Sequence, residues 1–272
     1  MRHRQREIIT TLGVHPEIDP VVEIEQRSHF LADYLAQAGL NGFVLGISGG
    51  QDSLLAGLLA KRAVQERRDT GHDASFHAML LPYGTQADRD DALMACDLIQ
   101  PDFTHDFDIK HAVDGVATEF EVAEAKPMQD FDKGNVKARV RMIAQYAIAG
   151  ENNLLVIGTD HGAEAVTGFF TKYGDGGADV LPLSGLNKRQ GKQLLKEFGV
   201  PEQFIAKKPT ADLLDNNPGQ TDESELGLSY EQIDDFLEGR DIPEAVAEAI
   251  EARYNSTEHK RALPVAYTDN AV

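Results

Sequence analysis

Short apolar runs alternate with helical patterns along the first part of the chain. The apolar runs predict strands at residues 43–47, 76–81, 104–107 and 154–158. Apolar residues at helical spacing predict helices at residues 20–38, 53–68, 88–99, 109–121 and 136–149. Strands that alternate with helices form right-handed βαβ units and a parallel sheet. We therefore predict an α/β fold with a doubly wound, mostly parallel sheet that carries helices on both faces.

The pattern changes after Gly158. Residues 169–179 are rich in glycine and have no periodicity, which predicts a long loop that is either ordered or able to close. Further helices are predicted at residues 188–198, 229–238 and 243–254, and a polar, mobile loop at residues 214–223. The sequence contains no internal repeat and no interdomain linker, so we expect a single domain over residues 1–272.

Composition and charge limit the class of protein. The 272 residues carry a net charge of −19, which argues against general binding to nucleic acid or to an anionic membrane surface. No apolar run approaches the ~20 residues of a membrane span, and the basic N-terminus leads into no apolar signal region. The only cysteine, Cys96, lies on an apolar helical face and has no partner for an internal disulfide. We expect a soluble protein of the cytoplasm.

The loop between the strand at residues 43–47 and the next helix carries the strongest chemical signal. A glycine turn at the start of a helix directs backbone N–H groups and the helix dipole at one point, where phosphate binds. Asp52 stands where the GxxxxGK[ST] loop has its lysine. Because a carboxylate beside phosphates is unfavourable without a cation between them, the loop predicts Mg²⁺ as well as a nucleotide.

Two other strands are also followed by polar segments, PYGTQADRD and TDHGAEAVTG. Ligands of parallel sheets bind at the carboxyl ends of strands, so carboxylates of the second segment are candidates for a further protein ligand to the cation. His161 has no HxH or HExxH spacing around it. We interpret it as a structural hydrogen-bonding residue, with a metal ligand as the alternative. No nucleophilic cysteine stands out, so nitrogen delivered by this chain alone would come as free ammonia.

The SGGxDS segment resembles the PP-loop of ATP pyrophosphatases, which cleave ATP to AMP and pyrophosphate. Six further blocks resemble the ammonia-dependent NAD⁺ synthetases, in the expected order and over nearly the whole chain. These blocks are KGNVKAR (133–139), GTDH (158–161), GFFTKYGDGG (168–177), KRQG (188–191), PTADL (209–213) and TEHKR (257–261).

The resemblance implies an adenine nucleotide alpha hydrolase-like fold and an ATP- and Mg²⁺-dependent ligase. Such an enzyme adenylates the nicotinate carboxylate of deamido-NAD⁺ and amidates it with ammonia, giving NAD⁺, AMP and pyrophosphate. By position, the pyrophosphate is held by Gly46, Ile47, Ser48, Gly49, Gly50, Gln51, Asp52 and Ser53, and ATP is contacted by Thr159, Lys188 and Thr210. Mg²⁺ is bound by Asp52 and Glu164, and deamido-NAD⁺ is contacted by Arg139, Lys172, Asp179, His259 and Lys260. Asp175 orients or deprotonates the ammonia, and the catalytic residues are Asp175 and Lys188.

The resemblance also implies a homodimer with the deamido-NAD⁺ site at the interface. It gives possible roles in the partner's site to Tyr34, Phe131, Asn135 and Tyr146. One departure is Leu80, because relatives commonly carry an arginine immediately before the LPYG-like segment. The alternatives are another PP-loop adenylating or amidating ligase that acts on a different carboxylate, or a nucleotide-binding module without catalysis.

Overall fold

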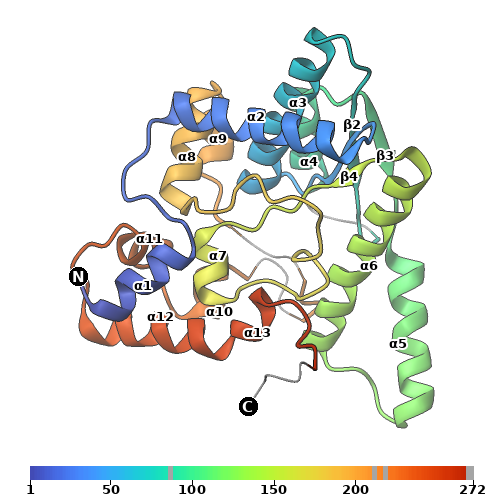
Figure 1. Ribbon diagram of the computed structural model, residues 1–272. Helices are drawn as coiled ribbons and strands as arrows, with labels where there is room; N and C mark the ends of the chain where they lie inside the picture. Colours follow the sequence, from blue (N-terminus) through green and yellow to red (C-terminus); the bar gives the residue numbers. More distant parts are fainter. Residues whose placement is uncertain (85–87, 210–212, 217–219, 268–272) are drawn as a thin grey trace.

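The computed structural model describes residues 1–84, 88–209, 213–216 and 220–267, and these residues form a four-stranded sheet flanked by helices (Figure 1). The strands are β1 (Gly42–Gly46), β2 (Ser75–Leu80), β3 (Phe103–Asp106) and β4 (Leu155–Val156), in the spatial order β3-β2-β1-β4. All neighbouring pairs are parallel. The first strand, β1, is therefore an inner strand of the sheet. β2 and β3 are added on one side of it and β4 on the other, as expected for a doubly wound sheet.

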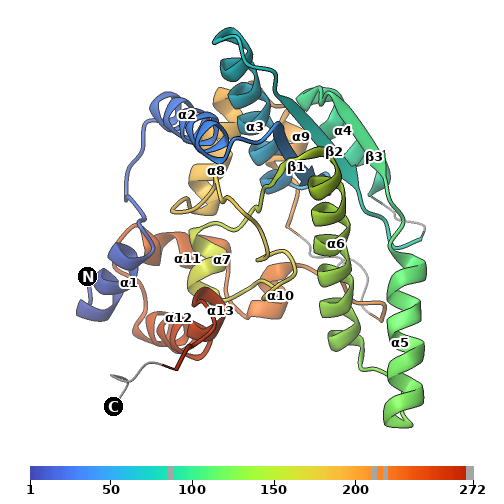
Figure 2. The same ribbon diagram turned by 45° about the vertical axis from the view of Figure 1, so that its right-hand side comes forward.

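Helices cover both faces of this sheet. One face packs against α2 (Pro20–Ala38), α3 (Gln51–Asp69), α4 (Arg89–Ile99), α8 (Lys188–Glu197) and α9 (Glu202–Ile205). The opposite face packs against α5 (Lys110–Glu124) and α6 (Asp130–Asn152), which lie side by side in Figure 2. Alternate residues of β1 serve the two faces, with Phe43 and Leu45 in the first core and Val44 in the second.

A third apolar core lies beside the sheet. It is built by α1 (His3–Thr11), α7 (Gly162–Thr167), α11 (Tyr230–Leu237) and α12 (Glu244–Ser256), with Ile8, Val166, Phe236 and Ile250 fully buried. The short helices α10 (Asp222–Leu226) and α13 (Glu258–Arg261) complete the described elements. Among the described residues, no helix is long and apolar enough to cross a membrane.

The predicted strands and the parallel order are confirmed, and α2 has the predicted bounds. Three local predictions are wrong. Helix α1 was not expected, α6 begins at Asp130 rather than at residue 136, and the predicted loop at 214–223 contains the start of α10. In α10 the Thr221 hydroxyl accepts the N–H of Ser224, and the acidic first turn complements the helix dipole. The count of one domain stays a prediction.

Candidate active site

The switch point of the sheet lies between β1 and β4, and a cavity of about 550 Å³ opens there at their carboxyl ends. The loop after β1 and the loop after β4 both line it. The lining includes most residues predicted to bind ATP, metal or ammonia: Gly46, Ile47, Ser48, Gly50, Gln51, Asp52, Ser53, Thr159, Glu164, Asp175 and Lys188. The sheet topology therefore brings together segments that are more than 100 residues apart.

The loop between β1 and α3 is held in shape by its own hydroxyl groups. The Ser53 hydroxyl accepts the N–H of Ser48 at 3.3 Å, and the Ser48 hydroxyl accepts the N–H of Gly50 at 3.2 Å. Gly49 has φ of +75°, and a Cβ there would lie 2.6 Å from the backbone nitrogen of Ala92, so α4 leaves room only for glycine. Gly50 caps α3 without a side-chain bond, which leaves the N–H groups of the first turn open to an anion.

Two glutamines fix the position of this loop. Gln145 of α6 accepts the N–H of Gly46 at 2.9 Å through its side-chain oxygen. Gln51 is buried, and its amide donates to the carbonyls of Ile205 at 2.9 Å and Lys207 at 2.8 Å. The Lys207 ammonium in turn lies 3.3 Å from the carbonyl of Gly49. The loop is thus held from α6 on one side and from the segment after α9 on the other.

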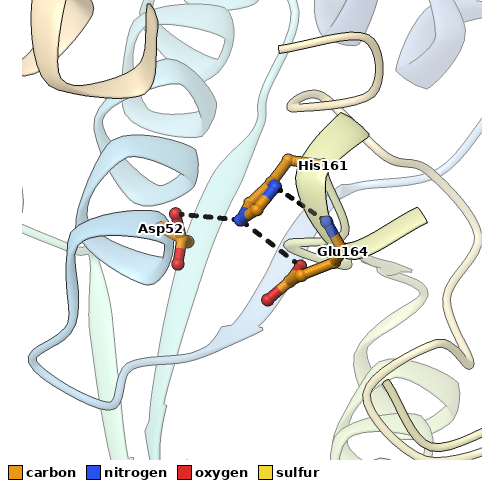
Figure 3. A group of neighbouring side chains, drawn as sticks. All are labelled: Asp52, His161 and Glu164. Carbon is orange, nitrogen blue, oxygen red and sulfur yellow. Dashed lines mark hydrogen bonds and ion pairs between the residues drawn. The ribbon is translucent and has the colours of Figure 1, made fainter. Parts of the chain in front are cut away.

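Asp52, Glu164, His161 and Lys188 form the charged centre of the cavity (Figure 3 shows the first three). The Lys188 ammonium lies 2.6 Å from Oδ2 of Asp52. Nε2 of His161 lies 3.7 Å from Oδ1 of Asp52 and 3.6 Å from Oε2 of Glu164. Ligand atoms of Asp52, His161 and Glu164 all lie within 4.8 Å of one another. This spacing lets one small cation contact both carboxylates.

Burial sets the electrostatics of this centre. Burial raises the pKa of the Glu164 carboxyl well above its ordinary value. Burial acts in the same direction on Asp52, but the Lys188 ammonium holds the pKa of that carboxyl below its ordinary value. Burial opposes the charge of Lys188, yet the attraction of Asp52 and Glu164 raises its pKa. Glu164 is therefore a largely buried acid, 18% exposed, whose ionised form lacks sufficient compensation, which is the environment that an added cation stabilises.

The N-terminus of α8 positions Lys188. Asn187 caps the helix, and its side chain and that of Gln190 form a reciprocal capping box. The buried carboxylate of Asp234 on α11 accepts the N–H of Lys188 at 3.1 Å and that of Arg189 at 2.8 Å. Sequence reasoning missed Asp234, and no motif marks it, because it acts on backbone groups of a distant helix.

A second acidic group lies where the loop after β4 meets residues 169–179. Burial, together with the neighbouring Asp175 carboxylate, raises the pKa of Asp160 to about 7. Oδ1 of Asp175 accepts the N–H of Thr171 at 2.9 Å, and successive turns follow to Gly177. Sequence reasoning included Asp160 only among the candidate cation ligands after β4, and it missed the proximity of Asp160 to Asp175.

The residues predicted to bind deamido-NAD⁺ are divided between the cavity and its surroundings. Lys260 lines the cavity and donates to the carbonyls of Gly168 and Phe170. Outside the lining, Arg139 donates to the carbonyl of Lys172, whose ammonium contacts the carbonyl of His259. These three residues are neighbours.

The two remaining predicted residues are Asp179 and Thr210. The Asp179 carboxylate accepts the N–H of Val156 at 2.8 Å and the hydroxyl of Tyr146 at 2.9 Å, so it holds β4 and α6 together. Thr210 lies outside the described residues. Leu80, the departure noted above, also lines the cavity, and it brings no charge to it.

A family profile and curated relatives both match this chain over most of its length. A profile of the NAD synthase family matches residues 23–264. The NH(3)-dependent NAD(+) synthetase of Bacillus velezensis is 59% identical over 266 residues, which are 98% of this chain and 98% of that relative.

Solved structures agree with this. The NAD+ synthetase of Burkholderia pseudomallei has a TM-score of 0.83 and 49% identity, and the match covers 96% of this chain and 97% of that one. An NMN synthetase from Francisella tularensis has a TM-score of 0.79 and 36% identity, covering 93% of this chain and 100% of that one. The similarity spans the sheet, the cavity and the helices around it.

Proposed function

The chain belongs to the NAD synthase family, and on that premise we propose that its cavity joins ammonia to the nicotinate carboxylate of deamido-NAD⁺ in a reaction driven by ATP. One observation carries the assignment of the site. The open N-terminus of α3, the carboxylates of Asp52 and Glu164 and the ammonium of Lys188 all face one cavity at the carboxyl ends of β1 and β4. The helix N-terminus complements phosphate, the two carboxylates complement a cation, and the ammonium complements developing negative charge.

The chemistry has two steps. A carboxylate is a poor electrophile, so an oxygen of the nicotinate carboxylate attacks the α-phosphorus of ATP. The bond from that phosphorus to the bridging oxygen breaks, and pyrophosphate leaves. Ammonia then attacks the carbonyl carbon of the acyl-adenylate, the bond to the AMP oxygen breaks, and nitrogen loses a proton to a base. The products are NAD⁺, AMP and pyrophosphate.

We assign the pyrophosphate to the loop at residues 46–53 and the charge on the leaving group to Lys188. The backbone N–H groups of the first turn of α3 supply fixed dipoles, and the buried Lys188 ammonium supplies a full charge. Thr159 lines the same cavity and offers a hydroxyl to the nucleotide. Thr210 retains its proposed ATP contact from the sequence resemblance alone.

The donor set fits Mg²⁺. Asp52 and Glu164 offer hard carboxylate oxygens, and the raised pKa of Glu164 marks a buried acid that a cation would stabilise. Asp52 and Glu164 would hold Mg²⁺ there, and the ion would supply charge that neutralises phosphate oxygens and stabilises the pyrophosphate. Two helices hold the carboxylates in place: Asp52 lies in the first turn of α3, and Glu164 lies in the first turn of α7.

Deamido-NAD⁺ is assigned to the side of the cavity bounded by Lys260, with Arg139, Lys172, Asp179 and His259 beyond it. Arg139, Lys172 and Lys260 supply positive charge to an anionic ligand in a chain with a net charge of −19. Screening confines such attraction to ~8–10 Å, so only local lysines and arginines serve this purpose. The neighbouring carbonyl contacts of Arg139 and Lys172 orient both side chains before the ligand arrives.

We further propose a homodimer through the exposed face of α6. Phe131, Ile143 and Tyr146 on this helix are 63%, 59% and 37% exposed, which is unusual for large apolar side chains on a helix that also packs on a sheet. Tyr34 on α2 is also exposed. A second copy that covers these residues would bring an apolar surface next to Arg139.

Asp175 is assigned to the incoming ammonia. Its carboxylate lines the cavity and is oriented by the N–H of Thr171, and Asp160 lies near enough to interact with it electrostatically. Burial raises the pKa of both carboxyls, and such a pair can bind an ammonium ion and accept a proton from it.

The decisive experiment follows the products with Mg²⁺, ATP, ammonium and a nicotinate ligand. We expect AMP, pyrophosphate and NAD⁺ in equal amounts when deamido-NAD⁺ is supplied. The specificity constant for deamido-NAD⁺ should exceed that for nicotinate mononucleotide, because the Lys260 side of the cavity would contact the adenylate half. ADP and phosphate as main products would reject the mechanism. A preference for the mononucleotide would keep the chemistry and overturn the substrate.

A further inference from the structure

His161 has a buried polar atom without a partner in the centre of the cavity. Its side chain is only 3% exposed, and among the described residues Nε2 makes no hydrogen bond. The atom points between Asp52 and Glu164, as Figure 3 shows, at 3.7 and 3.6 Å from their nearest oxygens. A buried polar atom without a hydrogen-bond partner lowers the stability of the folded chain, which indicates that Nε2 of His161 has a function at this position.

The other ring nitrogen determines which form of the imidazole is present. His161 is the N-cap of α7, and Nδ1 accepts the backbone N–H of Glu164 at 3.3 Å. A backbone amide only donates, so Nδ1 must carry the lone pair, and the proton of the neutral ring must be on Nε2. An Nδ1 that accepts a hydrogen bond is not protonated, so the ring is neutral. The cap of α7 therefore makes Nε2 a hydrogen-bond donor.

We propose that His161 is a positioning residue whose neutral Nε2–H draws Asp52 Oδ1 and Glu164 Oε2 together, and that it is not itself a ligand of the cation. Direct ligation requires a lone pair on Nε2, and the only lone pair of this tautomer is engaged by Glu164. Each carboxylate oxygen has two lone pairs, so an oxygen that accepts from His161 can still contact a cation. The inference rests on the proposed function for the identity of the cation, but the tautomer and the absence of ligation are properties of this chain alone.

A cation between the two carboxylates would complete this arrangement. The Nε2-to-oxygen distances of 3.7 and 3.6 Å exceed the usual upper limit of about 3.2 Å for an N–H···O hydrogen bond by roughly half an ångström. With a cation bound between the carboxylates, we expect Asp52 Oδ1 and Glu164 Oε2 to come within hydrogen-bond distance of Nε2–H, which would then hold both oxygens in place. Outer groups that orient metal-binding residues commonly contribute 10- to 100-fold to metal affinity.

Two spectroscopic measurements test the proposal without turnover. In protein labelled with ¹⁵N-histidine, two-bond ¹H–¹⁵N correlation spectra of the ligand-free chain should show His161 protonated at Nε2. Electron spin-echo measurements with Mn²⁺ in place of Mg²⁺ should show no nitrogen bound directly to the metal. A proton on Nδ1 in the first experiment, or a directly coordinated nitrogen that disappears in His161→Asn in the second, overturns it.

Two variants separate the cap from the donor. In His161→Asn the side-chain oxygen can still accept the N–H of Glu164, but the side chain is too short to place a donor between the carboxylates. We expect a thermal midpoint close to that of the parent and Mn²⁺ affinity reduced by about 10- to 100-fold. His161→Ala should lose both the cap and the affinity, and His15→Asn, at an exposed histidine, should change neither. Unchanged Mn²⁺ affinity in folded His161→Asn overturns the proposal. If amidation fails in the parent chain while these results hold, the proposed function is wrong and this inference stands.

Discussion

The ammonium of Lys188 lies 2.6 Å from Oδ2 of Asp52, and this contact joins the first turn of α8 to the first turn of α3. The Lys188 side chain is 4% exposed, so its charge depends on the carboxylate for compensation. Asp52 in turn is the residue that stands in place of a P-loop lysine. The positive charge that a P-loop carries within its own motif is therefore supplied here by another helix, 136 residues further along the chain.

Lys188 should be essential for the chemical step. Lys188→Ala removes the buried charge that stabilises the leaving pyrophosphate, and we expect turnover to fall by at least ~100-fold, equivalent to about 3 kcal/mol. Pyrophosphate release measured at saturating ATP checks this, with circular dichroism to verify folding. Lys196→Ala, at an exposed lysine of the same helix, is the control and should keep full activity. Loss of less than tenfold in folded Lys188→Ala would contradict the role.

Asp52 and Glu164 should both be required for the cation. Asp52→Ala and Glu164→Ala should each lower turnover by at least ~100-fold and weaken Mg²⁺ binding, because each removes a carboxylate from a cavity that concentrates negative phosphate charge. Titration of Mn²⁺ by electron paramagnetic resonance measures binding separately from activity. Glu151→Gln, at an exposed acid on α6, should change neither quantity. Near-normal activity of both alanine variants at saturating Mg²⁺ is incompatible with the assignment.

The sequence predicted those site segments whose position follows from chain order and sheet topology. Residues 46–53 were found because a strand, a glycine turn and a helix are consecutive in the chain, and their geometry is local. The carboxylates after β4 became candidates because parallel strands place their carboxyl ends at one edge, and the family resemblance then singled out Glu164. In both cases, chain order and sheet topology determine the position of the side chain.

Groups that act across elements were not predicted. Gln145 bonds to Gly46 over 99 residues and Asp234 bonds to Lys188 over 46 residues, and neither contact has a spacing that a sequence can reveal. Helix α1 was missed because its apolar face consists of little more than Ile8 and Ile9, which are buried only because α11 and α12 lie against them. Tertiary packing outweighs local propensity at such places.

The exposed face of α6 should be a dimer interface. Ile143→Glu would bury a charge without a partner in that interface, so we expect it to dissociate the dimer and lower activity. Fluorescence-detected sedimentation at nanomolar concentration measures the assembly. Leu93→Glu is the matched control, since Leu93 is 41% exposed on α4 and lies on a different helix. A parent chain that sediments as a fully active monomer would rule out the shared site.

Asp160 should make stability depend on pH. Burial and Asp175 raise the pKa of Asp160 to about 7 in the folded chain, whereas an unfolded aspartate titrates near 3.9. The folded state therefore binds this proton more tightly than the unfolded state, and the resulting stability is fully present below pH ~3.9 and lost as the pH rises through about 7.

Asp160→Asn removes this dependence. We expect the variant to have a higher thermal midpoint than the parent at pH 8 without Mg²⁺, and a similar midpoint at pH 4.5. Differential scanning calorimetry at the two values measures both, and Asp132→Asn, at an exposed acid of α6, should show no such difference. Equal midpoints of parent and Asp160→Asn at pH 8 would show that Asp160 ionises without cost in the folded chain.

The segment at residues 169–179 should respond to substrates, and Asp175 should act in the second half-reaction. An acyl-adenylate is easily hydrolysed, so the site must exclude water after adenylation and still admit ammonia. The segment is suited to this because its turns line the cavity at Asp175 and contact residues 259–262 through Lys172. Amide hydrogen exchange within it should slow markedly when ATP, Mg²⁺ and deamido-NAD⁺ are bound together. Equal exchange with and without ligands would mean that the turns are permanently closed.

Asp175→Asn isolates the charge from the structure of the turn. The asparagine oxygen can still accept the N–H of Thr171, so the turn is kept while the group that attracts and deprotonates ammonium is lost. We expect isotope exchange between pyrophosphate and ATP, which reports adenylation, to stay within about threefold of the parent, and amide formation to fall by ~100-fold, in the range for loss of a general base. Asp175→Ala should likewise impair amide formation more than adenylation, and it should also reduce order in residues 169–179. If adenylation and amide formation fall equally in Asp175→Asn, the carboxylate acts before ammonia arrives, and the base must be sought at Asp160, a neighbouring carboxyl whose pKa burial and Asp175 raise to about 7.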